Sequence, residues 1–251
     1  MQGWLGMEWR SLADNWVLQP RNPKAVVHFL GGAFVGAAPH VAYDALLTSL
    51  AEAGYLVITT PFFTSPQHGQ IADGVATTFR NGLVALAVEG LPMFGMGHSL
   101  GCKLHLLNSC RECAVGVGVR TGNVLMAYSN ASFGGDFSEL VPVEFEPSPA
   151  ETEALIDRDY SLERTLLVKF ERDEIDDIAA LRRQLGRKFG DSLDYRVLAG
   201  DHGTCAGGRY PLGTSREFSP VDAIGQFLYQ SLTRENQQLQ TVVSRWINQQ
   251  T

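Results

Sequence analysis

Long hydrophobic runs are missing from this 251-residue sequence, and cysteine is scarce, with four residues in all. No apolar stretch approaches the roughly 20 residues that a membrane-spanning helix needs. Residues 1–10 mix tryptophan, glycine and charged side chains, unlike the basic and then apolar pattern of a secretion signal. The cysteines, Cys102, Cys110, Cys113 and Cys205, lack the spacing of an extracellular disulfide framework. We therefore expect reduced thiols, no transmembrane segment and a cytoplasmic location.

Positive charge is also in short supply, because 20 Lys and Arg stand against 27 Asp and Glu, for a formal net charge of −7. The phosphates of a nucleic acid would repel such a chain as a whole, so we expect no nucleic-acid partner. Internal repeats are not evident, and the length suits one large domain with a sizeable core. The sequence leaves the oligomeric state open.

Short apolar runs alternate with segments of helical periodicity along most of the chain. Tryptophans among polar residues before Pro23 indicate an early antiparallel strand or hairpin at a sheet edge. Further strands are expected at residues 24–30, 55–60, 115–119, 123–128, 164–170 and 193–198, and helices at residues 39–53, 69–89, 177–189 and 220–248. This alternation predicts an α/β protein whose mostly parallel sheet has helices on both faces. Residues 1–251 are expected to form a single domain.

Residues 129–160 differ in composition from their surroundings. They contain Gly134, Gly135, three prolines and several acidic residues between Asp136 and Glu153. Such a composition is typical of a small lid or insertion over a cleft rather than of a second domain. We interpret the acidic residues as a solvated face.

Residues 91–101, Leu-Pro-Met-Phe-Gly-Met-Gly-His-Ser-Leu-Gly, predict a short buried strand that turns abruptly into a helix at Ser99. The last five residues fit the G-x-S-x-G pattern of a nucleophile elbow, a strained turn that exposes the serine hydroxyl. Gly97 and Gly101 are needed because the neighbouring backbones come into close contact and side chains there would collide. A glycine-rich turn whose serine only caps the helix is the alternative.

Backbone donors for an oxyanion are expected at two places. Leu100 opens the helix after Ser99, so its N–H has no partner within the helix and is free to face an oxyanion. Gly31 and Gly32 follow an apolar strand, and a glycine turn lets the backbone approach a ligand closely. The N–H of Ala33, or failing that of Phe34, would supply the second donor. An ordinary strand-ending turn is the alternative.

A serine hydroxyl is a poor nucleophile until an imidazole takes its proton, and that imidazole needs a carboxylate on its other nitrogen. His202 follows the last predicted strand, and an acidic cluster from Glu171 to Asp177 follows the strand before it. The carboxyl ends of parallel strands meet at one sheet edge, so these groups would converge there with Ser99. The chain order serine, acid, histidine is that of the α/β-hydrolases.

The chain resembles an α/β-hydrolase over nearly its whole length. The segments Phe29–Gly36, Gly97–Gly101 and Gly200–Gly203 more narrowly resemble a branch found in cyanobacteria and plastids. That branch is a family of unknown function, sometimes labelled esterase-like. The resemblance implies an eight-stranded hydrolase sheet and, for a plant-derived chain, a location in the plastid stroma.

The same resemblance implies roles for three residues, with Ser99 as the nucleophile, His202 as the general base and Asp173 as the acid. Asp176 and Asp177 lie close enough in sequence to compete for the role of the acid. The chain departs from many hydrolases in carrying Gly31 where they have a histidine ahead of the glycine turn. This departure weakens any assignment to an esterase subclass and leaves the backbone donors in place.

Two functions of different class follow. The first is a serine-dependent acyl hydrolase that cleaves a carboxylic ester, a lipid ester being a candidate because an acyl chain suits an apolar cleft beneath a lid. No cofactor and no metal are expected for it. The second is a catalytically silent hydrolase-fold protein that binds a lipid, a pigment or a protein partner. A zinc site built from Cys110, Cys113, His202 and Cys205 is a further alternative, although these residues lie far apart in the sequence.

Overall fold

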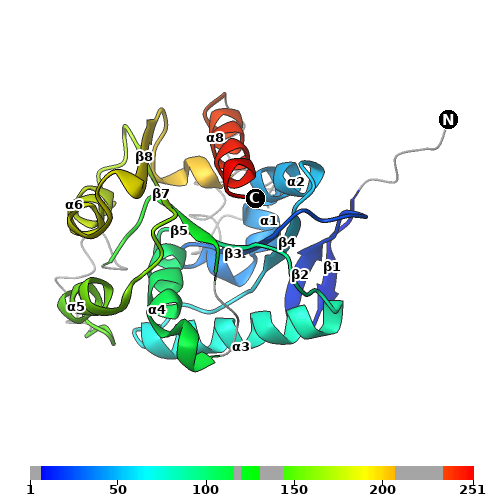
Figure 1. Ribbon diagram of the computed structural model, residues 1–251, viewed down its shortest axis with the longest axis horizontal. Helices are drawn as coiled ribbons and strands as arrows, with labels where there is room; N and C mark the ends of the chain where they lie inside the picture. Colours follow the sequence, from blue (N-terminus) through cyan, green and yellow to red (C-terminus); the bar gives the residue numbers. More distant parts are fainter. Residues whose placement is uncertain (1–6, 116–119, 131–143, 207–233) are drawn as a thin grey trace, which may run out of the picture.

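The computed structural model describes residues 7–115, 120–130, 144–206 and 234–251, with the backbone alone for residues 112–115. Its centre is an eight-stranded sheet with the strand order β1-β2-β4-β3-β5-β6-β7-β8 (Figure 1). The strands are β1 (Arg10–Leu12), β2 (Asn15–Leu18), β3 (Val26–Leu30), β4 (Leu56–Thr59), β5 (Met93–His98), β6 (Gly122–Met126), β7 (Thr165–Phe170) and β8 (Leu193–Leu198).

The sheet is mostly parallel. The six strands from β3 to β8 pair parallel to one another, whereas β1 and β2 form an antiparallel hairpin that joins the sheet beside β4. The edge hairpin and the parallel sheet predicted from the sequence are therefore confirmed. The strands β3 to β7 are almost continuously buried, as expected where helices cover both faces.

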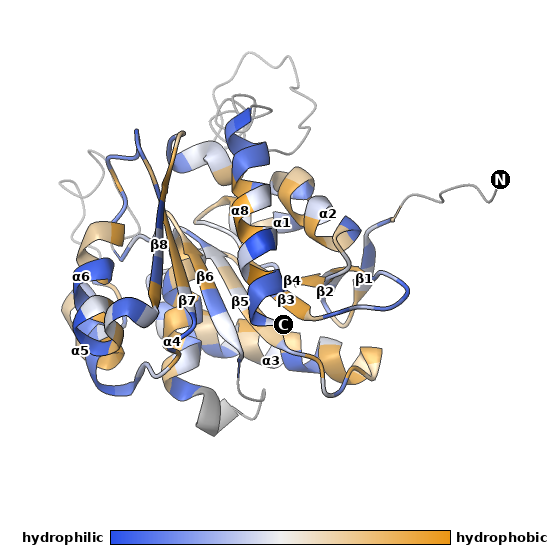
Figure 2. Cartoon of the chain, turned by 45° about the horizontal axis from the view of Figure 1, so that its top comes forward, coloured by the Kyte–Doolittle hydropathy of each residue, from blue (hydrophilic) through white to orange (hydrophobic). Residues whose placement is uncertain are grey.

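Helices cover the two faces of the sheet (Figure 1). They are α1 (Pro39–Ala42), α2 (Asp44–Glu52), α3 (His68–Leu86), α4 (Leu100–Val115), α5 (Pro149–Asp159), α6 (Ile178–Phe189) and α8 (Arg234–Gln250). On one face, α2 and α8 pack side by side over Val27, Phe94 and Met126. On the other face, α4, α5 and α6 pack together over Leu125 and Leu167. Figure 2 shows the result, with hydrophobic strands in the middle and hydrophilic residues on the outer sides of the helices.

The strand register brings four loops to one edge of the sheet. Leu30 at the end of β3 pairs with Gly97 near the end of β5, and Phe170 at the end of β7 pairs with Leu198 at the end of β8. The segments that follow these strands carry the glycine turn, Ser99, the acidic cluster and His202. The edge formed by the carboxyl ends of the strands therefore holds every residue of the predicted site.

Some predicted boundaries differ from the structure. The helix expected at residues 39–53 is interrupted at Tyr43, which separates α1 from α2 with φ −116° and ψ 20°. Val115 ends α4 instead of beginning a strand, and residues 116–119 lie outside the described part. Of the predicted insertion at 129–160, residues 131–143 lie outside the described part, and α5 packs against α4 and α6. Residues 220–233 of the predicted last helix also lie outside it. None of the described helices has the length and apolar character to cross a bilayer.

Candidate active site

Ser99 stands at the sharp turn between β5 and α4. Its φ of 54° lies in the left-handed region, which costs a residue with a side chain about 1–3 kcal/mol. Two hydrogen bonds hold the turn: the Ser99 N–H donates to Met126 O at 3.0 Å, and the Cys102 N–H donates to Ser99 O at 3.1 Å. The strained strand-to-helix turn that defines a nucleophile elbow is therefore present at Ser99.

The absence of side chains at Gly97 and Gly101 allows the backbone segments of this turn to pack closely. A Cβ added to Gly97 would lie 2.6 Å from the backbone nitrogen of Cys102, and a Cβ added to Gly101 would overlap the carbonyl oxygen of Leu30. Both obstacles are backbone atoms, which cannot rotate away as a flexible side chain can. The steric need for glycine predicted at these two positions is confirmed.

Gly101→Ala is expected to lower the free energy of unfolding by about 3 kcal/mol or more, because β3 and α4 must move apart to admit the methyl group. The matched control is Gly186→Ala in α6, where an added Cβ meets nothing within 4 Å. That change should be neutral or stabilise by up to about 1 kcal/mol, since alanine is the better helix former. Urea unfolding of both variants measures the difference, and equal midpoints would contradict the close packing of Gly101 on β3.

The glycine turn after β3 lies against the elbow. A Cβ added to Gly32 would come within 3.3 Å of Ser99 Cβ. The Gly32 carbonyl accepts a hydrogen bond from the Gly36 N–H at 2.8 Å. Because the C=O and N–H of a trans peptide point in opposite directions, the Ala33 N–H points away from Gly36. Among the described residues, no group accepts a hydrogen bond from the Ala33 N–H or from the Leu100 N–H.

The N–H of Phe34, the alternative donor, already has a partner. This N–H donates to Thr64 Oγ1 at 3.0 Å, so the loop after β4 already satisfies it. This hydrogen bond favours Ala33, which the sequence analysis named first, over Phe34 as the donor. Ala33 and Leu100 remain as the two candidate oxyanion donors.

His202 and Asp173 are brought together by the loops after β8 and β7. His202 Nδ1 lies 2.8 Å from Asp173 Oδ2, and the Asp173 carboxylate is buried. The other carboxylate oxygen accepts the Ile175 N–H at 3.0 Å. Burial alone would raise the pKa of Asp173, but the hydrogen bond and charge of His202, the Ile175 N–H and Lys169 together lower it. An ionised Asp173 keeps the His202 proton on Nδ1, which leaves Nε2 as an acceptor.

The two competing carboxylates have other partners. Asp176 Oδ2 lies 2.6 Å from Lys169 Nζ, and Asp176 Oδ1 accepts the Ile178 N–H at 2.9 Å. Asp177 Oδ2 accepts the Asn130 N–H at 2.8 Å. The structure therefore turns Asp173 toward His202 and engages Asp176 and Asp177 elsewhere.

Ser99 and His202 lie at the same sheet edge. His98, the neighbour of Ser99, has its Nε2 2.8 Å from the carbonyl oxygen of His202, and the two imidazole rings are 4.9 Å apart between centroids. Within the described part of the chain, no hydrogen bond joins Ser99 Oγ to His202 Nε2. Such a contact is often long before substrate binds and tightens in the reacting complex.

The cysteines show no arrangement for metal or redox chemistry in the described residues. Cys102 and Cys205 are buried free thiols, Cys110 is a half-buried one, and burial raises the pKa of each. No cluster of three or more His, Cys, Asp or Glu side chains that could hold a metal ion occurs among these residues. The side chain of Cys113 lies outside the described part.

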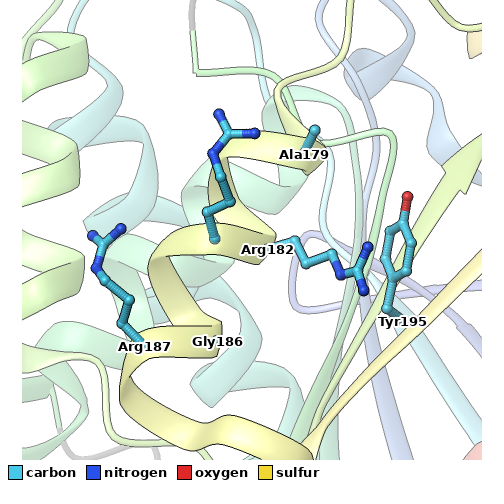
Figure 3. A pocket seen from close by; sticks show the side chains of 6 residues that line it. Ala179, Arg182, Gly186, Arg187 and Tyr195 are labelled. Atoms are coloured by element: carbon cyan, nitrogen blue, oxygen red, sulfur yellow. The ribbon is translucent and has the colours of Figure 1, made fainter.

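A recess of about 580 Å³ lies away from these groups, between α6 and β8 (Figure 3). It is lined by Ala179, Arg182, Arg183, Gly186, Arg187 and Tyr195. The Arg182 guanidinium carbon stands 4.1 Å from the centroid of the Tyr195 ring, and Arg187 extends away from that ring in Figure 3. None of its lining residues belongs to the Ser99, Asp173 and His202 group, so this recess is separate from the candidate site.

Sequence reasoning missed two residues at the site. Tyr43 is buried beside Gly31 and Gly32, and His98 is buried between Tyr43 and His202. The G-x-S-x-G pattern leaves the position of His98 free, and Tyr43 is 56 positions from Ser99 along the chain. The one indication in the sequence was that a histidine, which the G-x-S-x-G pattern does not require, directly precedes Ser99.

The layers, the sheet order and the elbow define an α/β-hydrolase fold, and solved structures agree. The chain is similar to carboxyl esterase 2 from Tuber melanosporum, with 15% identity, TM-score 0.62, and 96% of this chain and 86% of that chain covered. A hyperthermophilic esterase from Pyrobaculum calidifontis has 14% identity and TM-score 0.61, over 94% of this chain and 80% of that one. The fluorophosphonate-binding serine hydrolase F of Staphylococcus aureus has 13% identity and TM-score 0.57, over 75% of this chain and 85% of that one.

Residues 8–249 match the family described as "Protein of unknown function (DUF1350)". The chain belongs to that family. A search of the curated proteins finds no match. The family description names no reaction, so the function has to be argued from the site.

Proposed function

We propose that this protein is a serine-dependent acyl hydrolase that cleaves a carboxylic ester. The observation that carries the proposal is the 2.8 Å pair of the buried Asp173 and the partly buried His202, set at the same sheet edge as a serine in a strained elbow. A carboxylate on Nδ1 fixes the imidazole tautomer that can accept a proton at Nε2. A helix-capping serine would need neither this pair nor the left-handed backbone.

The proposed reaction has two halves. Ser99 Oγ attacks the ester carbonyl carbon while its proton passes to His202 Nε2, and the N–H groups of Ala33 and Leu100 bind the oxyanion. The tetrahedral intermediate collapses, the C–O bond to the alcohol breaks, and His202 returns the proton to the leaving alcohol. A water molecule then gives a proton to His202 and attacks the acyl-Ser99 ester, which releases the acid and restores the Ser99 hydroxyl.

Apolar side chains around the site support an ester with an apolar acyl group, a lipid ester included. Of the five exposed large hydrophobic side chains in the described residues, three belong to loops at this edge: Phe34, Phe63 and Ile175. Phe34 lies in the glycine turn, Phe63 follows β4, and Ile175 is two residues after Asp173. Exposed apolar groups gathered around a site favour an apolar ligand.

The test of this function is a panel of p-nitrophenyl esters of increasing acyl length, with the Ser99→Ala protein as the background. We expect turnover by the wild-type protein and only the uncatalysed rate with the variant. If neither folded protein hydrolyses any ester faster than the uncatalysed rate, the proposed hydrolase function is wrong and the silent, ligand-binding alternative is favoured.

Phe63→Ser is expected to lower kcat/KM for a long-chain ester about 3- to 10-fold and to leave kcat/KM for the acetate ester unchanged. The side chain is 85% exposed, so its loss costs apolar contact with the acyl chain and little stability. Val84→Ser is the matched control, because Val84 is 76% exposed on α3 and outside these loops. An equal loss with the two esters would contradict an apolar contact at Phe63.

A further inference from the structure

Three hydrogen bonds, two of them buried and the third partly buried, run from the glycine turn to the loop of His202. The Gly32 N–H donates to Tyr43 Oη at 2.9 Å, Tyr43 Oη lies 2.8 Å from His98 Nδ1, and His98 Nε2 lies 2.8 Å from the carbonyl oxygen of His202. A carbonyl can only accept, so His98 carries its proton on Nε2. His98 Nδ1 is then an acceptor, and the Tyr43 hydroxyl proton must point toward it. Each hydrogen atom in the chain of bonds therefore has one place.

Burial keeps these protons where they are. Both side chains are buried, with Tyr43 0% and His98 1% exposed. Desolvation, with a smaller effect from the nearby His202, lowers the pKa of His98 to about 3, so the ring stays neutral near neutral pH. Burial also raises the pKa of Tyr43, which keeps its hydroxyl protonated. A charged His98 would have a proton on Nδ1 and could not accept from Tyr43.

The local structure is built to deliver Tyr43 to this place. The chain breaks between α1 and α2 at Tyr43, and the ring then packs on the glycine turn. A Cβ added to Gly31 would lie 2.9 Å from Tyr43 Cε2. Glycine at position 31, where many hydrolases carry a histidine, therefore makes room for the tyrosine ring.

We propose that Tyr43 and His98 are positioning residues that lock the oxyanion turn and the His202 loop to each other on either side of Ser99. Tyr43 holds the Gly32 N–H while Gly36 holds the Gly32 carbonyl, so the peptide planes on both sides of Gly32 are fixed. The direction of the Ala33 N–H follows from the second of these planes. His98 holds the backbone of the residue whose side chain pairs with Asp173. This inference rests on the proposed acyl hydrolase function.

Substitutions can separate the two links of His98. Tyr43→Phe removes the hydroxyl with no change in shape. His98→Gln places an amide N–H near the position of Nε2, so it keeps the link to His202 O and loses the acceptor for Tyr43. His98→Asn places an oxygen near the position of Nδ1, so it keeps the link to Tyr43 and is too short to reach His202 O.

We expect Tyr43→Phe to lower kcat for a p-nitrophenyl ester about 10- to 100-fold with KM changed by less than about twofold, because only the geometry of the reacting complex is disturbed. The double variant Tyr43→Phe, His98→Gln should be no slower than Tyr43→Phe alone, since both changes remove the hydrogen bond between Tyr43 and His98. The double variant Tyr43→Phe, His98→Asn should have a fold loss of kcat equal to the product of the two single losses. The reason is that Tyr43→Phe removes the bond between Tyr43 and His98, whereas His98→Asn removes the bond between His98 and His202 O. A variant that loses thermal stability but keeps wild-type kcat per folded molecule would overturn the positioning role.

Nitrogen-15 spectra of the histidines provide a readout that does not depend on activity. The wild-type protein should show His98 as the Nε2–H tautomer, with an Nδ1 shift that moves in Tyr43→Phe. Ester turnover by the wild-type protein with full kcat retained in Tyr43→Phe would overturn this inference and leave the hydrolase function standing. Absence of turnover in a wild-type protein that shows the expected His98 tautomer would refute the hydrolase function instead. The positioning role of Tyr43 and His98 in catalysis would then be refuted with it.

Discussion

Ser99→Ala is expected to lower kcat for any ester that the protein hydrolyses by at least about 10⁴-fold, because the hydroxyl is the only group of the proposed site that forms the acyl-enzyme bond. The oxyanion donors and substrate contacts would remain, so KM should change little. The measurement is initial rates at saturating ester, corrected for the uncatalysed rate. Retention of more than a few per cent of the wild-type kcat would show that another group performs the reaction.

Ser99→Gly is the control that separates chemistry from folding. Glycine adopts φ 54° without strain, so this variant should be more stable than Ser99→Ala by about 1 kcal/mol and equally inactive. If activity were to follow stability between the two variants, the loss would reflect a damaged turn instead of a missing nucleophile.

Asp173→Asn is the second change with a large expected effect, a fall in kcat of about 10⁴-fold. An asparagine amide N–H would donate to His202 Nδ1, which forces the imidazole proton onto Nε2. Nε2 could then no longer accept the Ser99 proton. The shape of the side chain is preserved, so KM and the thermal unfolding midpoint should change much less than kcat.

Asp177→Asn is the matched control for that experiment. The residue lies four positions after Asp173 and its carboxylate binds the Asn130 N–H, with no bond to His202. We expect less than about a tenfold change in kcat. If Asp177→Asn and Asp173→Asn were equally inactive, the acid could not be assigned to Asp173 alone.

Ser99 and its surroundings could be predicted from the sequence because the information is local. Two glycines, an apolar strand and a helical pattern stand within about a dozen positions of one another. The acid was harder to predict, because the three aspartates within five positions are indistinguishable by spacing. Their partners distinguish them, since Lys169 engages Asp176 and the Asn130 N–H engages Asp177, which leaves Asp173 as the aspartate beside His202. Neither partner can be recognised without the folded chain.

The glycine turn after β3 and the hydrogen bonds through Tyr43 and His98 could not be predicted from the sequence for the same reason. Which N–H of the glycine turn stays without a partner depends on Thr64, a residue of a different loop that takes the Phe34 N–H. Tyr43 lies within a segment whose periodicity predicts one continuous helix, and its inward orientation follows from the break at that position. Side chains that meet only through tertiary contacts give no pattern along the chain.

Labelling with a fluorophosphonate probe, followed by peptide mass spectrometry, tests the nucleophile directly and needs no knowledge of the substrate. The phosphonyl group should form a single adduct on Ser99 of the folded protein, with release of fluoride. Labelling should be lost in Ser99→Ala, strongly slowed in Asp173→Asn, and abolished when the wild-type protein is unfolded in urea. A folded wild-type protein that forms no adduct at Ser99, or that forms one at another residue, would contradict the assignment of Ser99 as the nucleophile.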